Sequence, residues 1–296
     1  MANENRLCPI CCGLGSKSRM MIDLFYNDRI FNYLRCEDCG VIYIDPIPNQ
    51  DDFQKMYNYS SYHDVHYSVN NDSEYVSTDL SSVFTSNLAV GSTVLDYGCG
   101  NGELINNLKS IGYKCYGIEY TADAALAASI HTGEHVFNLS EFNFTSFGVK
   151  FDAIYLGDVL EHLHDPISVL RDLSLLLKDD GKFIIQGPLE NSINFVSLIF
   201  HIYSIIKKYV LRINKIHASP THLLRFNARQ QKLVFQKAFP LHILHYWKVY
   251  DTGWPYNQGG LLKRLIAAIS IWISGNTYFL SESGNRFIAC FTVKKI

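Results

Sequence analysis

The sequence predicts an α/β protein in which a parallel sheet, covered by helices on both faces, follows a small N-terminal module. From Ser92 onward, short apolar runs that suit strands alternate strictly with segments of helical spacing. Such alternation is typical of parallel strands joined by helical crossovers. The first 39 residues depart from this pattern, because they contain five of the eight cysteines of the chain.

Composition and length favour one large domain with an accessory module. The chain has 296 residues, of which 48% are hydrophobic and 18% are charged, so it can bury a sizeable core. Its formal net charge of −2 gives no general attraction for nucleic acid. We divide the chain into an N-terminal ribbon at residues 1–48, a tyrosine-rich linker and helix at 49–90, and a sheet domain at 91–296.

The expected elements of the sheet domain follow one another in order. Strands are predicted at 93–98, 114–120, 151–159 and 181–187, and helices at 103–112, 121–131 and 166–178. A last strand, from Arg286 to Val293, agrees with a terminal hairpin of the sheet and offers no candidate catalytic residue.

Four cysteines are spaced like the ligands of a metal ion. Cys8 and Cys11 form one CxxC pair, and Cys36 and Cys39 form a second pair after 24 intervening residues. Each pair places two thiolates on one tight turn, and two such turns complete the tetrahedral shell that zinc prefers. We therefore predict a structural zinc ribbon, with unliganded buried thiols as the alternative reading.

The N-terminus predicts a cytoplasmic location. Its first residues lack the basic start and the continuous apolar run of a secretory signal. In a reducing compartment, clustered cysteines indicate metal ligation rather than disulfide bonds.

The longest apolar stretch, from Ile193 to Leu211, is a poor candidate for a spanning helix. His201, Lys207 and Lys208 interrupt it, whereas a span needs about 20 mostly uncharged residues. We expect a helix that covers the sheet on its substrate side. The basic residues at the end of the 192–216 segment leave contact with a membrane surface open.

The central motif, VLDYGCGNG, lies between a predicted strand and a predicted helix. Glycines at positions 98, 100 and 102 let the turn approach a ligand closely, and ligands of such sheets bind at the carboxyl ends of strands. A dinucleotide fingerprint would require glycine where Glu103 stands, which argues against NAD, and no P-loop pattern is present. Asp96 and Glu103 near the loop suit a cationic ligand without phosphate.

Glu119 ends the next predicted strand, in the sequence GIEY. A carboxylate at this place can accept two hydrogen bonds from a ribose diol. The alternative is that Glu119 only begins the following helix, where the helix dipole favours an acid. Together with the glycine loop, the ribose interpretation is preferred.

These motifs resemble those of the class I S-adenosylmethionine-dependent methyltransferases. VLDYGCGNG is similar to their first motif, GIEY to the acidic end of their second strand, and FDAIYLGDVLEHLHDP to their fourth-strand motif. The resemblance implies a Rossmann-like, doubly wound sheet of seven strands and S-adenosylmethionine as the cofactor. An N-terminal ribbon, a tyrosine-rich link and a late PTH segment extend the resemblance to methyltransferases of sugar and polysaccharide biosynthesis.

The resemblance also assigns residues to the cofactor. It implies that one acid and two glycines lie near the methionine part and that Glu119 lies near the ribose. Near the adenine it implies a pair of residues in which an asparagine replaces the usual acid. A tyrosine of the linker, among Tyr57, Tyr59 and Tyr62, could close over the cofactor. The expected cofactor-binding residues are Tyr62, Asp96, Gly98, Gly100, Glu119, Asn138, Leu139 and Asp158.

Two histidines are candidates for a general base. A neutral imidazole is the natural proton acceptor near pH 7. His222, in SPTHLLRF, follows the fifth strand on the expected acceptor side and ranks first, although a surface or packing role fits the sequence equally well. His162, in LEHLHDP, ranks second, because it could also make a structural hydrogen bond, and His164 is expected to face solvent.

The leading hypothesis is methyl transfer to a small-molecule acceptor, a sugar that is nucleotide-linked or carried on a glycan precursor. One alternative is an RNA methyltransferase guided by the ribbon, but the ribbon segment contains five acids that would repel phosphate, and no NPPY-type motif follows the fourth strand. Another alternative is a noncatalytic module that binds the cofactor. The acceptor atom and the oligomeric state stay open. The five acids are Asp23, Asp28, Glu37, Asp38 and Asp45.

Overall fold

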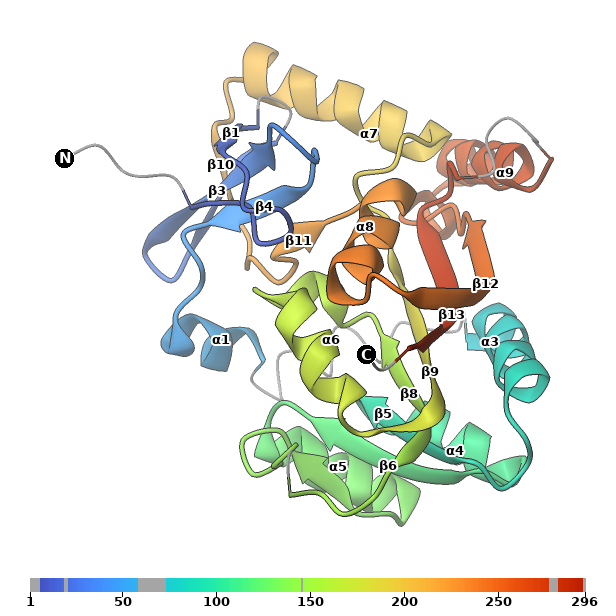
Figure 1. Cartoon of the computed structure of the whole chain (residues 1–296). Helices are drawn as coiled ribbons and strands as arrows, with labels where there is room; N and C mark the ends of the chain where they lie inside the picture. The colour runs from blue at the N-terminus through green and yellow to red at the C-terminus, as the bar shows by residue number, and fades with distance from the viewer. Residues whose placement is uncertain (1–5, 19–20, 58–72, 145, 277–281, 295–296) are drawn as a thin grey trace.

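The computed structural model of the chain contains two sheets that are joined by one hydrophobic core (Figure 1). Two of the three tyrosines considered for closure over the cofactor, Tyr59 and Tyr62, lie outside the described residues, so the expected contact of Tyr62 with the cofactor stays a prediction. The structure describes residues 6–18, 21–57, 73–144, 146–276 and 282–294.

The larger sheet has seven strands in the order β12-β13-β9-β8-β5-β6-β7. Strands β5 to β9 are mutually parallel where they pair, whereas β13 is antiparallel to both of its neighbours. This confirms the predicted α/β fold with a seven-stranded sheet. The strands are β5 (Thr93–Tyr97), β6 (Lys114–Glu119), β7 (Val136–Asn138), β8 (Phe151–Gly157), β9 (Leu177–Pro188), β12 (His242–Tyr250) and β13 (Arg286–Val293).

Helices cover both faces of this sheet, as the alternation of strands and helices predicts. Successive side chains of β8 point to opposite faces, so that Ile154 and Leu156 join one buried cluster and Ala153 and Tyr155 join the other. Helices α6 and α8 pack into the first cluster, and α3, α4 and α5 pack into the second. The helices are α1 (Gln50–Met56), α3 (Ser73–Asn87), α4 (Glu103–Ser110), α5 (Ala122–Thr132), α6 (Pro166–Ser174), α7 (Phe195–Ile205), α8 (Ala228–Ala238) and α9 (Leu261–Asn276).

The smaller sheet combines the N-terminal module with a segment from late in the chain. Four of its six strands come from the first 48 residues, and the other two come from residues 215–225. The expected boundary at residue 48 therefore does not isolate this sheet, because β10 pairs with β2 and β11 pairs with β4. The strands are β1 (Gly15–Lys17), β2 (Asp23–Tyr26), β3 (Arg29–Cys36), β4 (Ile42–Asp45), β10 (Lys215–His217) and β11 (Leu224–Arg225).

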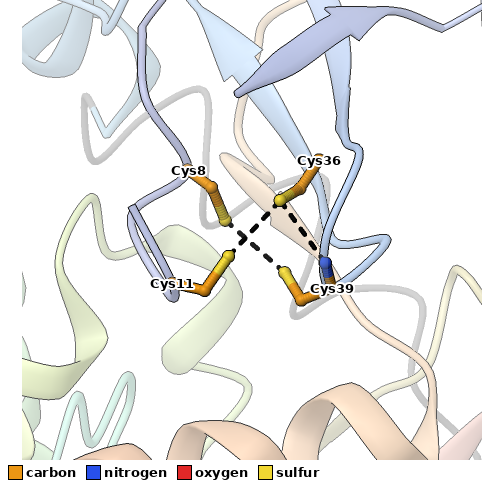
Figure 2. Close-up of side chains that lie close together, drawn as sticks. All are labelled: Cys8, Cys11, Cys36 and Cys39. Atoms are coloured by element: carbon orange, nitrogen blue, oxygen red, sulfur yellow. Dashed lines mark hydrogen bonds between the residues drawn. The ribbon is translucent and has the colours of Figure 1, made fainter. Parts of the chain in front are cut away.

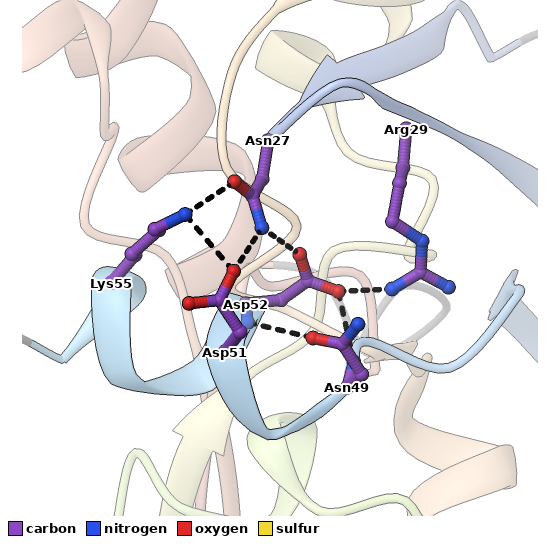
Figure 3. A network of polar contacts seen from close by, with 6 residues as sticks. All are labelled: Asn27, Arg29, Asn49, Asp51, Asp52 and Lys55. Carbon is purple, nitrogen blue, oxygen red and sulfur yellow. Dashed lines mark hydrogen bonds and ion pairs between the residues drawn. The ribbon is translucent and has the colours of Figure 1, made fainter.

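A polar network fastens α1 to the hairpin between β2 and β3 (Figure 3). Asn49 caps the helix and exchanges two hydrogen bonds with Asp52 in a capping box. The buried carboxylate of Asp52 also accepts a hydrogen bond of 2.7 Å from Asn27 Nδ2 and pairs with Arg29. The network fixes where the chain leaves the smaller sheet and thereby places Tyr57, the first residue after α1.

The apolar stretch after residue 192 forms α7 and continues into a π-helical turn, η2 (Ile206–Val210). Helix α7 lies along the outer edge of the molecule and packs against α9, so the expectation that it covers the sheet is wrong (Figure 1). None of the helices in the described part of the chain combines the length and the apolar character that crossing a bilayer requires.

Candidate functional site

The two CxxC pairs meet at one point, as their spacing predicts (Figure 2). The sulfur atoms of Cys8 and Cys39 lie 3.6 Å apart, and those of Cys11 and Cys36 lie 3.4 Å apart. All four sulfurs lie within 4.8 Å of one another. Zinc–sulfur bonds of about 2.3 Å in a tetrahedral site separate the sulfurs by about 3.8 Å, so the donor set fits such an ion.

Backbone N–H groups point at two of these sulfurs. The amide of Ile10 lies 3.5 Å from Sγ of Cys8, and the amide of Cys39 lies 3.5 Å from Sγ of Cys36. N–H groups aimed at sulfur favour the thiolate, which is the form that binds metal. Cys12, the fifth cysteine of the module, is exposed and outside the cluster.

The glycine loop between β5 and α4 forms the edge of a second site. Gly98, Gly100 and Gly102 all adopt positive φ, at 80°, 56° and 80°, a conformation that residues with a side chain rarely adopt. A Cβ atom on Gly98 would lie 2.7 Å from the side chain of Val159, which follows β8. The glycines therefore let the loop turn sharply against the fourth-strand motif.

Glu119, at the end of β6, holds this loop in place. One of its carboxylate oxygens accepts a hydrogen bond of 2.7 Å from Gly100 N, and the other accepts one of 2.7 Å from Tyr120 N. Burial nevertheless raises the pKa of Glu119. The predicted ribose-binding acid thus lies beside the glycine loop, at the carboxyl edge of the parallel strands.

Asp96 is a buried acid near the end of β5, just before the glycine loop. Burial, together with the nearby charge of Glu119, raises the pKa of Asp96 to about 8. The carboxyl groups of Asp96 and Glu119 therefore meet at this edge of the sheet. Both are costly to ionise when no cation is nearby. Their chemistry fits a ligand that carries positive charge and no phosphate.

The adenine-side pair consists of Asn138, which ends β7 and lies opposite Glu119 of β6, and Leu139, which follows it. Asn138 is buried, and its Nδ2 donates a hydrogen bond of 3.2 Å to the carbonyl of Tyr120. Its Oδ1 accepts hydrogen bonds from both the amide and the hydroxyl of Ser140. Asn138 therefore already uses its carbonyl to close the turn, and Leu139 donates its amide to the carbonyl of Glu119 at 2.8 Å. A contact of Asn138 with adenine would compete with Ser140.

Asp158 forms an ion pair that the sequence interpretation missed. It adopts positive φ, at 54°, directly after β8. Both carboxylate oxygens of Asp158 lie 2.7 Å from Nη2 of Arg286, which begins β13. The last strand thus brings a cation to the fourth-strand motif, although the sequence offered no candidate there.

His162 is held by its Nδ1 atom. This nitrogen lies 2.8 Å from the carbonyl of Thr221 and 3.0 Å from the hydroxyl of Tyr57. Because a carbonyl can only accept, Nδ1 carries the proton and Nε2 keeps its lone pair in the neutral ring. Burial lowers the pKa of His162 to about 4. Tyr57 from the linker therefore contacts His162, and the closure of a linker tyrosine over the cofactor stays a prediction.

His222 forms an ion pair with Glu190, which the sequence interpretation overlooked. Nδ1 of His222 lies 2.9 Å from one carboxylate oxygen of Glu190, and Arg225 lies 3.4 Å from the other. Burial opposes ionisation of Glu190, but the charges of Arg225 and His222 outweigh it and lower its pKa to about 2. Burial likewise opposes the charged form of His222, but Glu190 outweighs it and raises the pKa of the imidazole.

The two histidines meet beside a buried acid. Their ring centroids lie 4.8 Å apart, nearly perpendicular to each other. Glu161 is buried, its Oε1 has no hydrogen-bond partner among the described residues, and burial raises its pKa to about 8. One atom each of Glu161, His162 and His222 lie within 4.8 Å of one another, so the three could exchange protons or share a cation. His164 is exposed, as expected.

The segment around His222 is fixed between the two sheets. The amide of Leu223 donates a hydrogen bond of 2.8 Å to the carbonyl of Glu161, and its carbonyl accepts one of 3.0 Å from Ile44 of β4. Arg225 donates a hydrogen bond of 2.9 Å to the hydroxyl of Tyr33 on β3. The cysteine-bearing sheet therefore positions the residues that surround the His222–Glu190 pair.

Comparisons with known proteins agree with this geometry. Residues 71–243, more than half of the chain, match a family described as a methyltransferase domain. A ubiquinone biosynthesis O-methyltransferase of Glaesserella parasuis is 32% identical over 132 residues, covering 41% of this chain and 54% of that relative. The protein of the same name from Haemophilus ducreyi is 31% identical over 117 residues, covering 36% and 47%. The chain thus spans about half the length of these curated relatives.

A solved structure shows the same fold. It is the complex between the Haloferax volcanii Trm112 methyltransferase activator and a chain described as a methyltransferase. The alignment has a TM-score of 0.52 at 12% identity and covers 84% of this chain and 100% of that chain. At this identity the likeness concerns the arrangement of the elements alone.

Proposed function

The chain belongs to this methyltransferase-domain family, and from that premise we propose that it transfers a methyl group from S-adenosylmethionine to a hydroxyl of a small-molecule acceptor. The observation that carries the proposal is that the His222–Glu190 pair and the acid-lined glycine loop approach the same segment, which follows β8. On this segment Glu161 lies near His222, and Val159 faces the glycine loop. A paired imidazole supplies a proton acceptor, and the loop supplies a place for a cationic cofactor.

The residues of the loop fit this cofactor. Asp96 and Glu119 are acids that burial disfavours as anions, and a bound sulfonium with its ammonium group would compensate their charge. Glu119 would hold the ribose hydroxyls, and the turn at Gly98 and Gly100 would admit the methionine part. When bound, S-adenosylmethionine supplies a methyl group that is activated for in-line displacement.

His222 is the base in the proposed reaction. With Nδ1 bonded to Glu190, the neutral ring presents Nε2 as the proton acceptor. In this role Nε2 would accept the proton of the acceptor hydroxyl, whose oxygen would displace the sulfur from the methyl carbon. The sulfur–methyl bond would break with its electron pair staying on sulfur, so the positive charge would pass from the sulfonium to the imidazolium. Glu190 stabilises that imidazolium, and Arg225 keeps Glu190 ionised and in place.

For the acceptor, we propose a sugar or a glycan precursor. The support is the combination of ribbon, core motifs and late PTH segment, which resembles methyltransferases of sugar and polysaccharide biosynthesis. The curated relatives are named for O-methylation in ubiquinone biosynthesis, which supports oxygen as the accepting atom. A phenolic acceptor is therefore the main competitor.

The cysteine cluster is proposed to bind one structural zinc ion. Its support is the set of four sulfurs within 4.8 Å of one another, held by N–H groups on two turns. With four protein ligands, no position is left for substrate. The ion would add folding free energy to the cysteine-bearing sheet, because metal binding is coupled to folding.

The test is transfer of a labelled methyl group from S-adenosylmethionine to a panel of acceptors. The panel contains nucleotide sugars, glycan precursors, polyprenylated phenols and total RNA, and the matched control is His222→Ala. Label on a sugar, lost in the control, supports the proposal. Label on RNA or on nitrogen overturns it, and cofactor binding without transfer to any acceptor assigns the chain a noncatalytic role.

A further inference from the structure

Helix α7 and its π-helical extension present apolar side chains to solvent. Phe200, Ile202, Tyr209, Val210 and Leu211 are all exposed, and Val210 keeps 70% of its surface. A monomeric protein rarely exposes so many large apolar residues side by side. Such a patch indicates a surface that contacts something apolar.

Helix α9 extends this patch. Leu261, Leu262, Leu265 and Trp272 are exposed, with 89% of Leu261 and 71% of Leu262 accessible. Helices α7 and α9 contact each other and lie at the same edge of the molecule, well apart from the glycine loop (Figure 1). We call the exposed apolar side chains of residues 198–211 and 261–272 the α7–α9 face.

The part of the sequence around this face is strongly basic. Residues 198–215 and 261–272, the segments that carry the face, contain six lysines and arginines and no acid, although the whole chain has a net charge of −2. Asp251, which packs against α9, is buried and accepts a hydrogen bond from Ser270. On the face itself, Lys207 lies over the ring of Tyr203, at 4.6 Å from its centroid, and Lys263 and Arg264 are exposed beside Leu262. An apolar surface bordered by cations therefore results.

We propose that the α7–α9 face binds the surface of an anionic lipid bilayer. Amphipathic helices with lysine or arginine beside large apolar and aromatic residues lie in the headgroup region, where both parts are satisfied. A second copy of the chain is a poorer occupant, because pairing this face with itself would bring the same cations together. No helix of the described residues is suited to span a membrane, so contact would be confined to the surface.

The position of the α7–α9 face links membrane contact to the proposed catalytic pair. Helix α7 and η2 lie in the segment that joins Glu190 to His222. A bilayer at the α7–α9 face would therefore lie next to the chain segment that carries both members of this pair. The proposed contact depends on the exposure and charge of these helices and on no property of the acceptor.

The test is sedimentation of the full chain with vesicles of two compositions. Vesicles of phosphatidylcholine with about a third phosphatidylglycerol should bind at least tenfold more tightly than phosphatidylcholine alone, and added salt should weaken that binding. Val210→Glu with Leu262→Glu should reduce binding more than tenfold. The matched control is Ile130→Glu on α5, because Ile130 is 76% exposed but lies outside the face.

Two results with the native protein and the double variant would overturn the proposal. One is a folded protein, verified by an unchanged melting temperature, that does not sediment with the anionic vesicles. The other is a concentration-dependent dimer in light scattering that the double variant converts to monomer, without any vesicle binding, since this would assign the face to a second copy. Equal loss of binding in Ile130→Glu would also count against the α7–α9 face.

Discussion

Nδ1 of His222 lies 2.9 Å from a carboxylate oxygen of Glu190, although the two residues are 32 positions apart in the chain. The contact selects the tautomer of the imidazole, because an ionised carboxylate can only accept a hydrogen bond. It also leaves Nε2 as the basic atom. The pair thus has the arrangement of a base with its orienting acid, and its consequences can be measured.

Replacement of His222 by alanine should lower turnover by about a hundredfold or more, because this is the usual contribution of a general base. The dissociation constant of S-adenosylmethionine should hardly change, since His222 is not among the residues of the glycine loop. Single-turnover kinetics and calorimetry give the two quantities separately. His162→Ala should change both turnover and the dissociation constant, because His162 shapes the cofactor side of the site. Normal turnover in His222→Ala with loss in His162→Ala would transfer the role of base to His162.

The pH profile of kcat/KM should distinguish the same two histidines. Glu190 raises the pKa of His222, so the rate should fall as pH decreases through a value above the ordinary 6.5, where the base becomes protonated. His162, with a pKa lowered to about 4, would give no such loss near neutral pH. Glu190→Gln should shift the acid limb to lower pH and slow turnover. An unchanged acid limb in Glu190→Gln would contradict the coupling.

A chelator provides a control for these experiments. Glu161, His162 and His222 each offer one atom to a common centre, so a divalent ion could occupy it. Activity that EDTA abolishes and magnesium or manganese restores would make His222 a ligand rather than a base. Activity that survives EDTA, with zinc retained in the ribbon, leaves proton transfer as its role.

Much of the large sheet was predictable because each of these strands and helices carries its own local pattern of apolar residues. The runs ending at Gly98, Glu119 and Gly187 carry the apolar pattern of buried strands, and the intervening segments have helical spacing. The late strands of the small sheet were not predictable. Strands β10 and β11 have three and two residues, too few for any periodicity, and their pairing with β2 and β4 is set by tertiary contacts.

The parts of the candidate site that carry a sequence motif were predictable. The parts that depend on contacts between distant residues were not. The spacing of the four cysteines indicated their cluster, and the glycine motif indicated the loop. Glu190 was missed, although its place just after a predicted strand put it at the ligand-binding edge of the sheet. Arg286 carried no such signal, since its contact with Asp158 joins residues 128 positions apart.

The metal prediction links the ribbon to the reaction. Purified chain should contain one zinc ion, and Cys36→Ser should release it and lower the melting temperature, because the ion supplies folding energy to the small sheet. Turnover should fall more than cofactor affinity, since Ile44 of this sheet holds Leu223, next to His222. Elemental analysis, melting curves and kinetics test these statements, and Cys12→Ser is the matched control. Zinc-free protein purified under reducing conditions would refute the prediction.

Loss of the acid at the end of β6 should affect binding rather than chemistry. Glu119→Ala should weaken the affinity for S-adenosylmethionine more than tenfold, because the ribose hydroxyls lose a charged acceptor and the Gly100 amide loses its partner. Turnover at saturating cofactor should change less. Calorimetry on native and variant protein measures the difference. Affinity within twofold of the native value would remove Glu119 from the cofactor site.

Asp96→Asn should make the cofactor-free protein more stable while it weakens the site. In the unfolded chain Asp96 ionises near 3.8, but in the folded chain its pKa is about 8, so the free energy of unfolding falls as pH rises between these values. Each pH unit in this range lowers the free energy of unfolding by roughly 1.4 kcal/mol. Asparagine does not ionise, so the variant does not lose this free energy. In denaturant unfolding, the stability gain of the variant over the native protein should therefore be largest at pH 8 and smallest at pH 4. S-adenosylmethionine should raise the melting temperature of the native protein alone. A variant that is destabilised equally at both pH values would show that the carboxylate is already compensated by charges within the protein.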